Sequence, residues 1–441
     1  MTGRIDWQAL REQVARTEPW ARVGRLEELV GLVLRSRGPE CAVGSICQIR
    51  PPAPAPPFLA EVVGFRQEQV LLMPYGEARG VRPRVPVILE DRQAQVRVGP
   101  GLLGRVLDGL GEPLDGRGPL RQVPETYPLY SPSPNPCLRE PIRQPLDVGI
   151  RAINGLLTLG KGQRVGIFAG SGVGKSTLLG MMARFTASEV SVIGLIGERG
   201  REVKDFIEES LGPEGLARSV VVAATSDTPP LVRLRGAYLA TAIAEYFRDQ
   251  GHDVLLLMDS LTRFAMAARE IGLAVGEPPT ARGYTPSVFT RLPGLLERAG
   301  TCQGRGSITG IYTVLVEGDD LLEPIADASR AILDGHLVLS RDLADRGHYP
   351  AIDLLGSISR LMPQVTTPEH RRLREQAVRV LAVYRQAEDL INIKAYVRGS
   401  NPEIDFALEK IAALNRYLRQ DTAEAAAFPQ ALAQLEEIFA T

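Results

Sequence analysis

The sequence has little that would cross-link the chain or anchor it in a membrane. Its 441 residues include only four cysteines (Cys41, Cys47, Cys137 and Cys302), and their spacing indicates neither a zinc site nor a disulfide framework. No apolar run reaches the about 18 residues of a membrane span. The first 16 residues mix charges of both signs and lack the apolar centre of a secretory signal. We therefore expect a soluble protein of the cytoplasm.

Net charge is also nearly absent. The 51 Lys and Arg residues are balanced by 52 Asp and Glu residues, so the formal net charge is −1 and the isoelectric point lies near 6.5. Such a balance gives no general basic field that would attract nucleic acid or anionic lipid, and we expect no nucleic-acid partner. Hydrophobic residues make up 44% of the chain, which is enough for sizeable cores. The length suggests about three domains.

The first hundred residues predict a helix followed by a small β-barrel. Apolar side chains recur among polar ones over residues 4–17, so we expect residues 1–20 to form a short amphipathic helix that binds a partner or docks on its own domain. Residues 21–98 are typical of a closed barrel, because short β-rich runs alternate with Gly and Pro. These runs are 29–34, 45–49, 59–65, 70–73, 85–89 and 94–98. Only Phe58, Phe65 and Tyr75 are aromatic in this stretch, too few to interleave with basic residues as in an oligonucleotide-binding barrel, so we interpret it as structural.

Residues 99–364 are expected to form a linker and an α/β domain, and residues 365–441 a helical domain. The Gly- and Pro-rich segment 104–145 predicts extended chain. Beyond residue 150, apolar strands alternate with helices, which predicts a mostly parallel sheet covered on both faces. The predicted strands are 164–168, 190–196, 220–224, 254–258, 308–316 and 333–339, and the predicted helices are 176–185, 202–211, 230–250 and 261–271. Further helices are predicted at 368–385, 404–419 and 428–439.

A glycine-rich loop between a predicted strand and a predicted helix is the most informative motif. Its residues are Ala169, Gly170, Ser171, Gly172, Val173, Gly174, Lys175, Ser176 and Thr177. In such a loop the backbone N–H groups surround phosphate oxygens at the positive end of a helix dipole. Lys175 is expected to bind the β- and γ-phosphates and Ser176 to bind Mg²⁺. The strict pattern starts with Gly, but its first position tolerates the small side chain of Ala169. The motif predicts a nucleoside triphosphate site.

Two carboxylates follow apolar strands further along the chain. Asp259 ends the predicted strand 254–258 and is a candidate ligand of Mg²⁺, partly through water. Glu198 follows the strand 190–196 and is a candidate for polarising the attacking water. Arg199 beside it would stabilise charge or order the site. Each pattern taken alone also fits an ordinary strand end or a charged helix start.

Several longer stretches carry a family resemblance. They include Arg-Ala-Ile-Asn-Gly-Leu-Leu-Thr at 151–158, and the segments 161–164, 169–184, 198–208, 259–263, 281–289 and 349–353. From about residue 20 to residue 441 the chain resembles the rotary-type hexameric ATPases. It is most similar to the flagellar type III export ATPases, which are paralogues of the catalytic subunit of F-type ATP synthase.

The resemblance implies a RecA-like P-loop ATPase domain, with ATP and Mg²⁺ as its ligands, that couples hydrolysis to the export of flagellar proteins. It implies that Glu198 is the catalytic glutamate and that Tyr349 packs on adenine. Arg360 matches the arginine finger, which enters the site of a neighbouring subunit and stabilises charge on the transferring phosphoryl group. One chain carries both halves of such a site, which is consistent with a homohexamer.

Partners are implied as well. Residues 1–20 match by position the region that binds a stator-like regulatory protein. Residues 316–324 resemble the loop that faces the channel of the ring, where their acidity suggests contact with a central stalk protein or a substrate; a solvated acidic loop is the alternative. Export substrates, chaperones and an export gate complete the expected partners. The gate would bring the cytoplasmic protein to the periphery of the inner membrane.

Other functions stay open on the sequence. The ATPase of a virulence secretion system would share every candidate catalytic residue. The catalytic subunit of a rotary ATP synthase would need a separate finger donor, whereas this chain carries Tyr349 and Arg360 together. An RNA translocase would need an RNA-binding N-terminal domain, which Phe58, Phe65 and Tyr75 among few lysines support poorly. A non-catalytic ATP-binding subunit would be marked by loss of Glu198.

Overall fold

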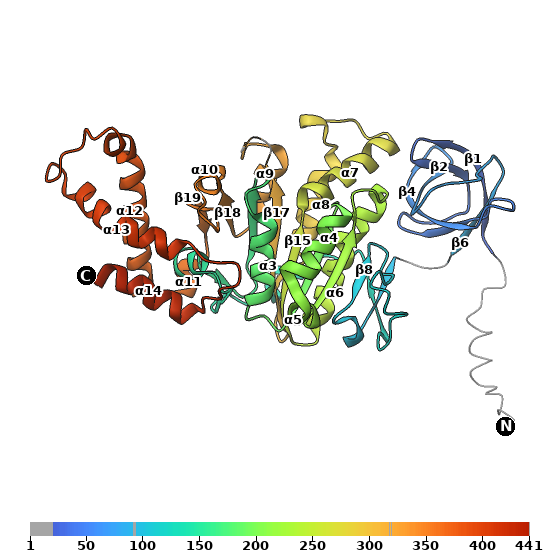
Figure 1. Cartoon of the computed structure of the whole chain (residues 1–441). Helices are drawn as coiled ribbons and strands as arrows, with labels where there is room; N and C mark the ends of the chain where they lie inside the picture. The colour runs from blue at the N-terminus through green and yellow to red at the C-terminus, as the bar shows by residue number, and fades with distance from the viewer. Residues whose placement is uncertain (1–20, 91–93, 317, 319, 441) are drawn as a thin grey trace, which may run out of the picture. The chain divides into compact units, whose positions relative to one another are not determined.

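The computed structural model describes residues 21–90, 94–316, 318 and 320–440 (Figure 1). The predicted helix within residues 1–20 lies outside this part of the chain. The main division into two compact units falls between Ala94 and Gln95. The first unit contains a β-barrel, and the second contains a large sheet and the C-terminal helices. The predicted fold class is confirmed, and a separate domain from residue 365 onward stays a prediction.

The barrel closes in the order β1-β2-β5-β4-β3-β6. Its strands are β1 (Val23–Val30), β2 (Val33–Arg37), β3 (Ile46–Ile49), β4 (Phe58–Arg66), β5 (Gln69–Pro74) and β6 (Pro86–Glu90). The predicted strand 29–34 is wrong, because Gly31 takes a left-handed φ of 57° and turns the chain between β1 and β2. The predicted strand 94–98 is not part of the barrel: it forms β7 (Gln95–Val98), which pairs with β9 (Glu125–Pro128) in the second unit.

The sheet of the second unit has nine strands, eight of them in the order β19-β18-β12-β17-β15-β13-β14-β8. They are β8 (Val106–Asp108), β12 (Arg164–Ala169), β13 (Val190–Ile196), β14 (Ser219–Ala224), β15 (Asp253–Asp259), β17 (Ser307–Leu315), β18 (Gly335–Leu339) and β19 (Ile352–Ser359). Neighbours in this order run parallel, except that β19 is antiparallel to β18. The ninth strand, β16 (Gly300–Thr301), pairs antiparallel with β17. The described residues also contain two short strand pairs: β7 with β9, and β10 (Pro145–Leu146) with β11 (Leu159–Gly160).

Three strands of this sheet were not predicted: β8, β16 and β19. β16 has only two residues. β8 lies in the segment predicted to be an extended linker, and it has only three residues. β19 alternates buried and exposed residues at an edge of the sheet, so it lacks the apolar run by which the inner strands were recognised.

Helices cover both faces of the sheet. Along β13, Ile193 and Leu195 share a buried cluster with Leu179 of α3 (Lys175–Phe185), while a Cβ at Gly194 would lie 3.2 Å from Ala240 of α6 (Pro230–Asp249). Because side chains alternate along a strand, α3 and α6 lie on opposite faces. The predicted helix 202–211 forms as α4 (Gly200–Asp205) followed by a π-helical turn (Phe206–Leu211). The other helices of this region are α2 (Arg151–Leu156), α5 (Gly212–Ala217), α7 (Leu261–Val275), α8 (Pro286–Leu296), α9 (Pro324–Ile332), α10 (Arg341–Asp345) and α11 (Met362–Val365), with short 3-10 turns at Pro100–Leu102, Pro136–Leu138 and Ala281–Gly283.

Three helices end the chain: α12 (Pro368–Asn392), α13 (Pro402–Leu418) and α14 (Phe428–Ala440). Thr367 and Asn401 cap the first two, because each side chain accepts a hydrogen bond from a backbone N–H in the first turn. The helices contact one another and α2 through buried side chains such as Leu414 and Leu435. Among the described helices, none combines the length and the apolar character that a bilayer crossing requires.

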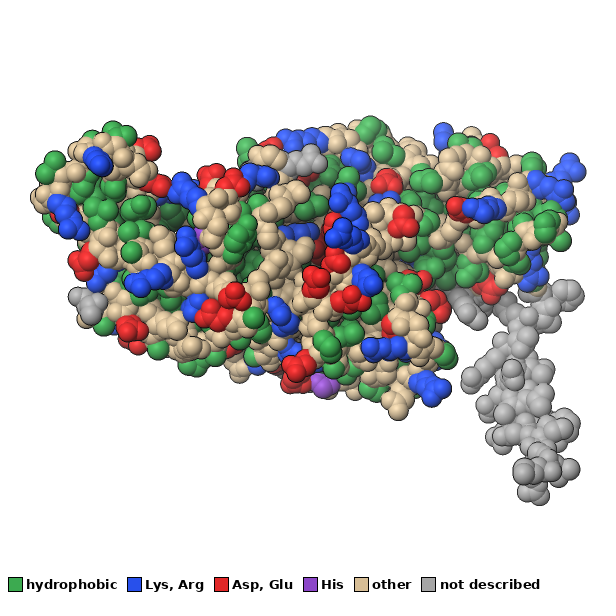
Figure 2. Space-filling model, in the orientation of Figure 1, with side chains coloured by type: hydrophobic (Ala, Val, Ile, Leu, Met, Phe, Trp, Pro, Cys, Tyr) green, Lys and Arg blue, Asp and Glu red, His purple; other side chains and the backbone are tan. Residues whose placement is uncertain are grey.

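The surface carries charges of both signs. On the face drawn in Figure 2, basic and acidic side chains are interspersed with apolar and polar ones over the second unit. This mixture accords with the formal net charge of −1.

Candidate nucleotide site

The glycine-rich loop joins β12 to α3, as predicted from the sequence. Gly172 and Gly174 take left-handed φ values of 80° and 89°, which glycine adopts without strain. A Cβ at Gly172 would meet nothing within 4 Å, so the loop is open on that side. Val173 is buried in the core and anchors the loop. No side chain caps α3, which leaves the first N–H groups of the helix available to phosphate oxygens.

Three charged side chains meet beside this loop at the carboxyl ends of three strands. Lys175 follows the loop, Asp259 ends β15, and Glu198 comes shortly after β13. Nζ of Lys175 lies 2.5 Å from Oδ1 of Asp259 and 3.5 Å from Oε1 of Glu198. The three side chains are 11%, 5% and 14% exposed, respectively. The residues that the sequence proposed for phosphate binding, metal binding and water activation therefore lie together.

Burial and charge shift two of these groups in ways that suit catalysis. Burial raises the pKa of Glu198 to about 7, and the neighbouring charge of Asp259 adds to the effect. Burial by itself would lower the pKa of Lys175, but the carboxylates of Asp259 and Glu198 outweigh it and raise that pKa. Lys175 is thus held as a cation. Glu198 titrates near neutral pH, where a carboxylate is well matched to accept a proton.

One polar neighbour of the site was missed from the sequence. Thr313 of β17 is fully buried, and its Oγ1 lies 2.6 Å from Oδ1 of Asp259, to which it donates a hydrogen bond. It fixes the carboxylate from the strand between β12 and β15. A hydroxyl inside the apolar run 308–316 was the available signal, but the sequence alone does not show that it faces Asp259.

The residues around this point fit Mg²⁺. Ser176, Asp259 and Glu198 line one cavity of about 200 Å³ together with Glu202 and Glu209. Within the described residues, no three His, Cys, Asp or Glu side chains form a ready metal cluster. A hydroxyl and a carboxylate beside a phosphate loop are the usual protein ligands of Mg²⁺, which is held mainly by substrate phosphates and water.

Tyr349 lies against the loop at Gly174. A Cβ placed on Gly174 would be 3.4 Å from Cε1 of the Tyr349 ring, and the tyrosine side chain is partly exposed. Its carbonyl oxygen accepts a hydrogen bond of 3.0 Å from the backbone N–H of Gln420, which connects it to the segment before α14. No sequence pattern pointed to Gln420.

Two predicted site residues are not brought to this cluster. The Arg199 side chain is 82% exposed and pairs with Glu202 at 3.4 Å, so its catalytic role stays a prediction. Arg360 follows β19, where its N–H donates to the carbonyl of Asp334 at 3.1 Å, and the N–H of Asp334 donates to the carbonyl of Arg164 at 2.8 Å. Arg360 therefore lies beside the first residue of β12, whereas the phosphate loop follows the last.

The comparisons with known proteins agree with this geometry. Residues 149–359 match the model of the ATP synthase alpha/beta family, nucleotide-binding domain, and residues 366–437 match that of the T3SS EscN ATPase C-terminal domain. The flagellum-specific ATP synthase of Pseudomonas aeruginosa is 54% identical over 95% of this chain and 93% of its own length. The type 3 secretion system ATPase of Xanthomonas euvesicatoria is 50% identical over 97% of each. The chain belongs to the family of flagellar and type III secretion ATPases.

Solved structures of this family have the same fold. The structure of the assembled ATPase EscN from the enteropathogenic E. coli type III secretion system is 44% identical, with a TM-score of 0.90 over 94% of this chain and 99% of that one. EscN in complex with its central stalk EscO has a TM-score of 0.87 at 43% identity. As a member of this family, the chain is an ATPase that couples ATP hydrolysis to protein export through a type III secretion apparatus.

Proposed function

We propose that this ATPase acts in flagellar export, as a ring of six identical subunits whose sites are completed by their neighbours. The flagellar assignment is supported by the relatives from Pseudomonas aeruginosa and Bacillus subtilis, which are named flagellum-specific ATP synthase and are 54% and 51% identical. The stretches 151–158 and 198–208 support it further. The shared site rests on one observation about Arg360.

That observation is the distance between Arg360 and the phosphate loop of the same chain. Arg360 lies beside Arg164 at the start of β12, and the loop begins after Ala169 at its end. At about 3.3 Å per residue, β12 separates them by roughly 16 Å, more than an arginine side chain spans. The Arg360 side chain is exposed, and its Nη2 donates to the carbonyl of Arg330 at 3.3 Å. An arginine finger at this position serves the site of a second copy.

The proposed roles follow from the geometry of the cluster. The loop N–H groups and Lys175 bind the phosphates of ATP, and Tyr349 supplies a flat surface for adenine. Ionised Glu198 accepts a proton from water as the water attacks the γ-phosphate in line. Arg360 of the adjoining subunit stabilises the charge on the transferring group. Positioning and charge stabilisation supply most of the catalysis.

Ser176 and Asp259 are the residues that would hold Mg²⁺. When bound, the metal neutralises charge on the β- and γ-phosphate oxygens. Asp259 is prepared for this task, because Thr313 fixes one of its oxygens. Lys175 occupies the same oxygen in this structure, so we infer that Lys175 moves toward the phosphates when nucleotide binds.

The partners belong to the same proposal. The solved complex of EscN with its central stalk supports a stalk protein in the channel of the ring. Residues 316–324 are the candidate contact, in which Leu322 is 78% exposed and Asp320 pairs with Arg282 at 2.7 Å. Residues 1–20 would bind a stator-like regulator, and export substrates, chaperones and a membrane export gate would meet the assembled ring.

The ring is tested by the ATPase rate per subunit of the purified chain as its concentration rises. Identical subunits that complete one another's sites give a rate that climbs steeply and then levels. A flat rate at all concentrations contradicts the shared site, whether or not the chain hydrolyses ATP.

A second candidate is the ATPase of a virulence secretion system, which the likeness to EscN favours. The two are separated by expressing the chain in a flagellated bacterium that lacks its own flagellum-specific ATP synthase. Restored motility supports the flagellar assignment, with Lys175→Ala as the inactive control. Restored secretion of virulence proteins in a strain that lacks its type III secretion ATPase, without motility in the first strain, supports the second candidate.

A further inference from the structure

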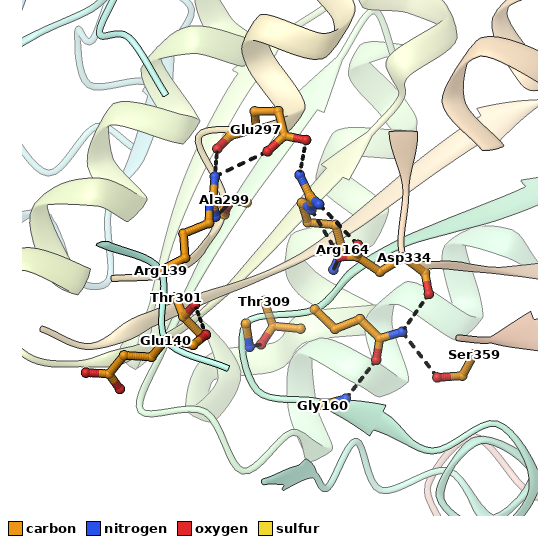
Figure 3. Close-up of polar contacts among 12 residues, drawn as sticks. Arg139, Glu140, Gly160, Arg164, Glu297, Ala299, Thr301, Thr309, Asp334 and Ser359 are labelled. Atoms are coloured by element: carbon orange, nitrogen blue, oxygen red, sulfur yellow. Dashed lines mark hydrogen bonds and ion pairs between the residues drawn. The ribbon is translucent and has the colours of Figure 1, made fainter. Parts of the chain in front are cut away.

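A buried glutamine directly precedes β12. It lies at the end of the sheet where the parallel strands begin, far from the phosphate loop. Gln163 has no exposed surface, and its Oε1 accepts a hydrogen bond of 2.8 Å from the N–H of Gly160. Its Nε2 donates to the carbonyl of Asp334 and to Oγ of Ser359, both at 3.2 Å. The three partners of this amide, Gly160, Asp334 and Ser359, are labelled in Figure 3. Both protons of the amide nitrogen are therefore used within the protein.

The two acceptors hold the backbone on which Arg360 is carried. Ser359 precedes Arg360 in the chain, and the carbonyl of Asp334 also accepts the N–H of Arg360 at 3.1 Å. The Gln163 side chain thus contacts both groups that hold the Arg360 backbone, the Asp334 carbonyl and Ser359. We propose that Gln163 is a positioning residue for Arg360, so that it acts on hydrolysis in the neighbouring subunit and not in its own. This inference rests on the proposed role of Arg360 as a finger.

The surroundings of Gln163 make this attachment rigid. Oγ of Ser359 donates to the carbonyl of Thr158 at 2.8 Å, so the hydroxyl is held on two sides. The carboxylate of Asp334 accepts from the backbone N–H and from Nε of Arg164, each at 3.0 Å. A Cβ at Gly335 would lie 2.6 Å from the carbonyl oxygen of Ile358, so the strand that bears Ser359 packs directly on β18.

This network continues along the same edge of the sheet. Nη1 of Arg164 lies 2.6 Å from Oε1 of Glu297, and Arg139 contacts the same glutamate and donates to the carbonyl of Ala299 at 2.8 Å (Figure 3). The charges of Arg164 and Arg139 are compensated by Glu297, whose side chain is 40% exposed. The network therefore reaches the surface at Glu297 as well as at Arg360.

Because Gln163 lies at the start of β12, its effect on finger donation can be separated from an effect on ATP binding in its own subunit. The hydrogen bonds of its side chain go to Gly160, Asp334 and Ser359, and none of these belongs to the phosphate loop or to the cluster around Lys175. Small displacements of a group that must meet a transferring phosphoryl are costly, with losses of about 10²-fold for an error near 1 Å. Loss of the Gln163 amide is therefore expected to impair finger donation and to spare ATP binding.

Mixed rings separate donation of the finger from use of the site. Lys175→Ala subunits keep the finger but lack a working site, and Arg360→Ala subunits keep the site but lack the finger. Each is inactive alone, and mixing them restores turnover where an Arg360→Ala site meets a Lys175→Ala neighbour. Gln163→Met is then added to one type of subunit at a time, because methionine keeps the size of the side chain and removes its hydrogen bonds.

Gln163→Met in the Lys175→Ala donor is expected to reduce the restored turnover about tenfold or more, with an unchanged KM for ATP. The same change in the Arg360→Ala acceptor is expected to leave turnover within about twofold. Equal losses in both arrangements, or no loss in the donor, overturn the positioning role. No turnover in the parent mixture overturns the finger in a neighbouring subunit, and the inference with it.

Ser359→Ala provides a second variant should Gln163→Met disturb folding, since it removes one hydroxyl and nothing else. It is expected to reproduce the loss in the donor more weakly. Ser307→Ala is the matched control, because Ser307 is also a buried serine where the parallel strands begin. Its Oγ donates to Asp253 at 2.7 Å and not to the groups that hold Arg360. A loss in the donor with Ser307→Ala as large as with Ser359→Ala contradicts the assignment.

Discussion

Nζ of Lys175 lies 2.5 Å from Oδ1 of Asp259, and both side chains are nearly buried. The lysine that is expected to bind phosphate thus neutralises the carboxylate that is expected to bind metal. Removing either partner leaves a buried charge without compensation, which is more costly than the loss of the ion pair itself. Because Glu198 lies 3.5 Å from the same nitrogen, this pair also controls the charge state of the proposed catalytic base.

Lys175→Ala is expected to abolish ATP hydrolysis, because among the described residues no other lysine forms an ion pair with Asp259 or Glu198. ATP binding should weaken as well, since the phosphates lose their cationic partner. Turnover and nucleotide affinity are measured on the purified variant, with circular dichroism to verify folding.

The matched control for this variant is Lys161→Ala. Lys161 pairs with Asp253 at 2.7 Å, but this pair lies where the parallel strands begin. The two side chains are more exposed than those of Lys175 and Asp259. Turnover of this variant should stay within about twofold of the parent, since exposed ion pairs contribute little. Retained hydrolysis in Lys175→Ala means that the loop has been assigned wrongly.

Glu198→Gln is expected to lower kcat by about 10² to 10⁴ while ATP still binds, because the amide keeps the shape of the side chain but accepts no proton. Single-turnover hydrolysis and binding of a fluorescent ATP analogue separate the two effects. Glu202→Gln is the control, since Glu202 lines the same cavity without contacting Lys175 in an ion pair. Equal losses in both variants indicate a general effect of cavity charge and not a catalytic base.

The raised pKa of Glu198 predicts a pH-dependent stability. Between its ordinary value of 4.5 and about 7, the folded chain holds a proton that the unfolded chain has released. The contribution of this group to the free energy of unfolding is therefore complete at low pH and is lost as pH rises through about 7. Relative to the parent, nucleotide-free Glu198→Gln should gain on the order of 3 kcal/mol between pH 4.5 and pH 8. Thermal unfolding of both proteins across this range measures the difference, and a constant difference contradicts the raised pKa.

The elements around the candidate nucleotide site were the most predictable part of the chain. β13 matches its predicted bounds, because it is apolar on both faces and stands between clear turns. β8 and β19 were missed since a three-residue strand and an alternating edge strand give no such run. In the site, Lys175 could be predicted from the glycine-rich motif, and Asp259 from its place at the end of an apolar strand. Thr313 and Gln163 could not, because their hydrogen bonds join segments far apart in the sequence and depend on how the strands are ordered.

Tyr349→Ala is expected to raise the KM for ATP roughly tenfold with little change in kcat, because stacking of a base on an aromatic ring contributes about 1–3 kcal/mol. The loss of affinity should be smaller for inorganic pyrophosphate, which has phosphate groups but offers no base to stack on the ring. Tyr349→Phe is the matched control, since it keeps the ring over Gly174 and removes only the hydroxyl. If the phenylalanine variant loses as much affinity as the alanine variant, the ring is not the binding surface.

Arg360→Ala is expected to leave ATP binding nearly unchanged and to reduce turnover by about 10³ or more. The reason is its position: Arg360 lies beside the start of β12, while the phosphates of its own site lie beyond the other end. Nucleotide affinity and turnover are measured above the concentration at which the parent rate levels. Arg371→Ala is the control, because Arg371 also donates to a backbone carbonyl, that of Pro363, at 2.8 Å. A collapse of ATP binding in Arg360→Ala assigns this arginine to the structure of its own subunit and removes the need for a neighbour.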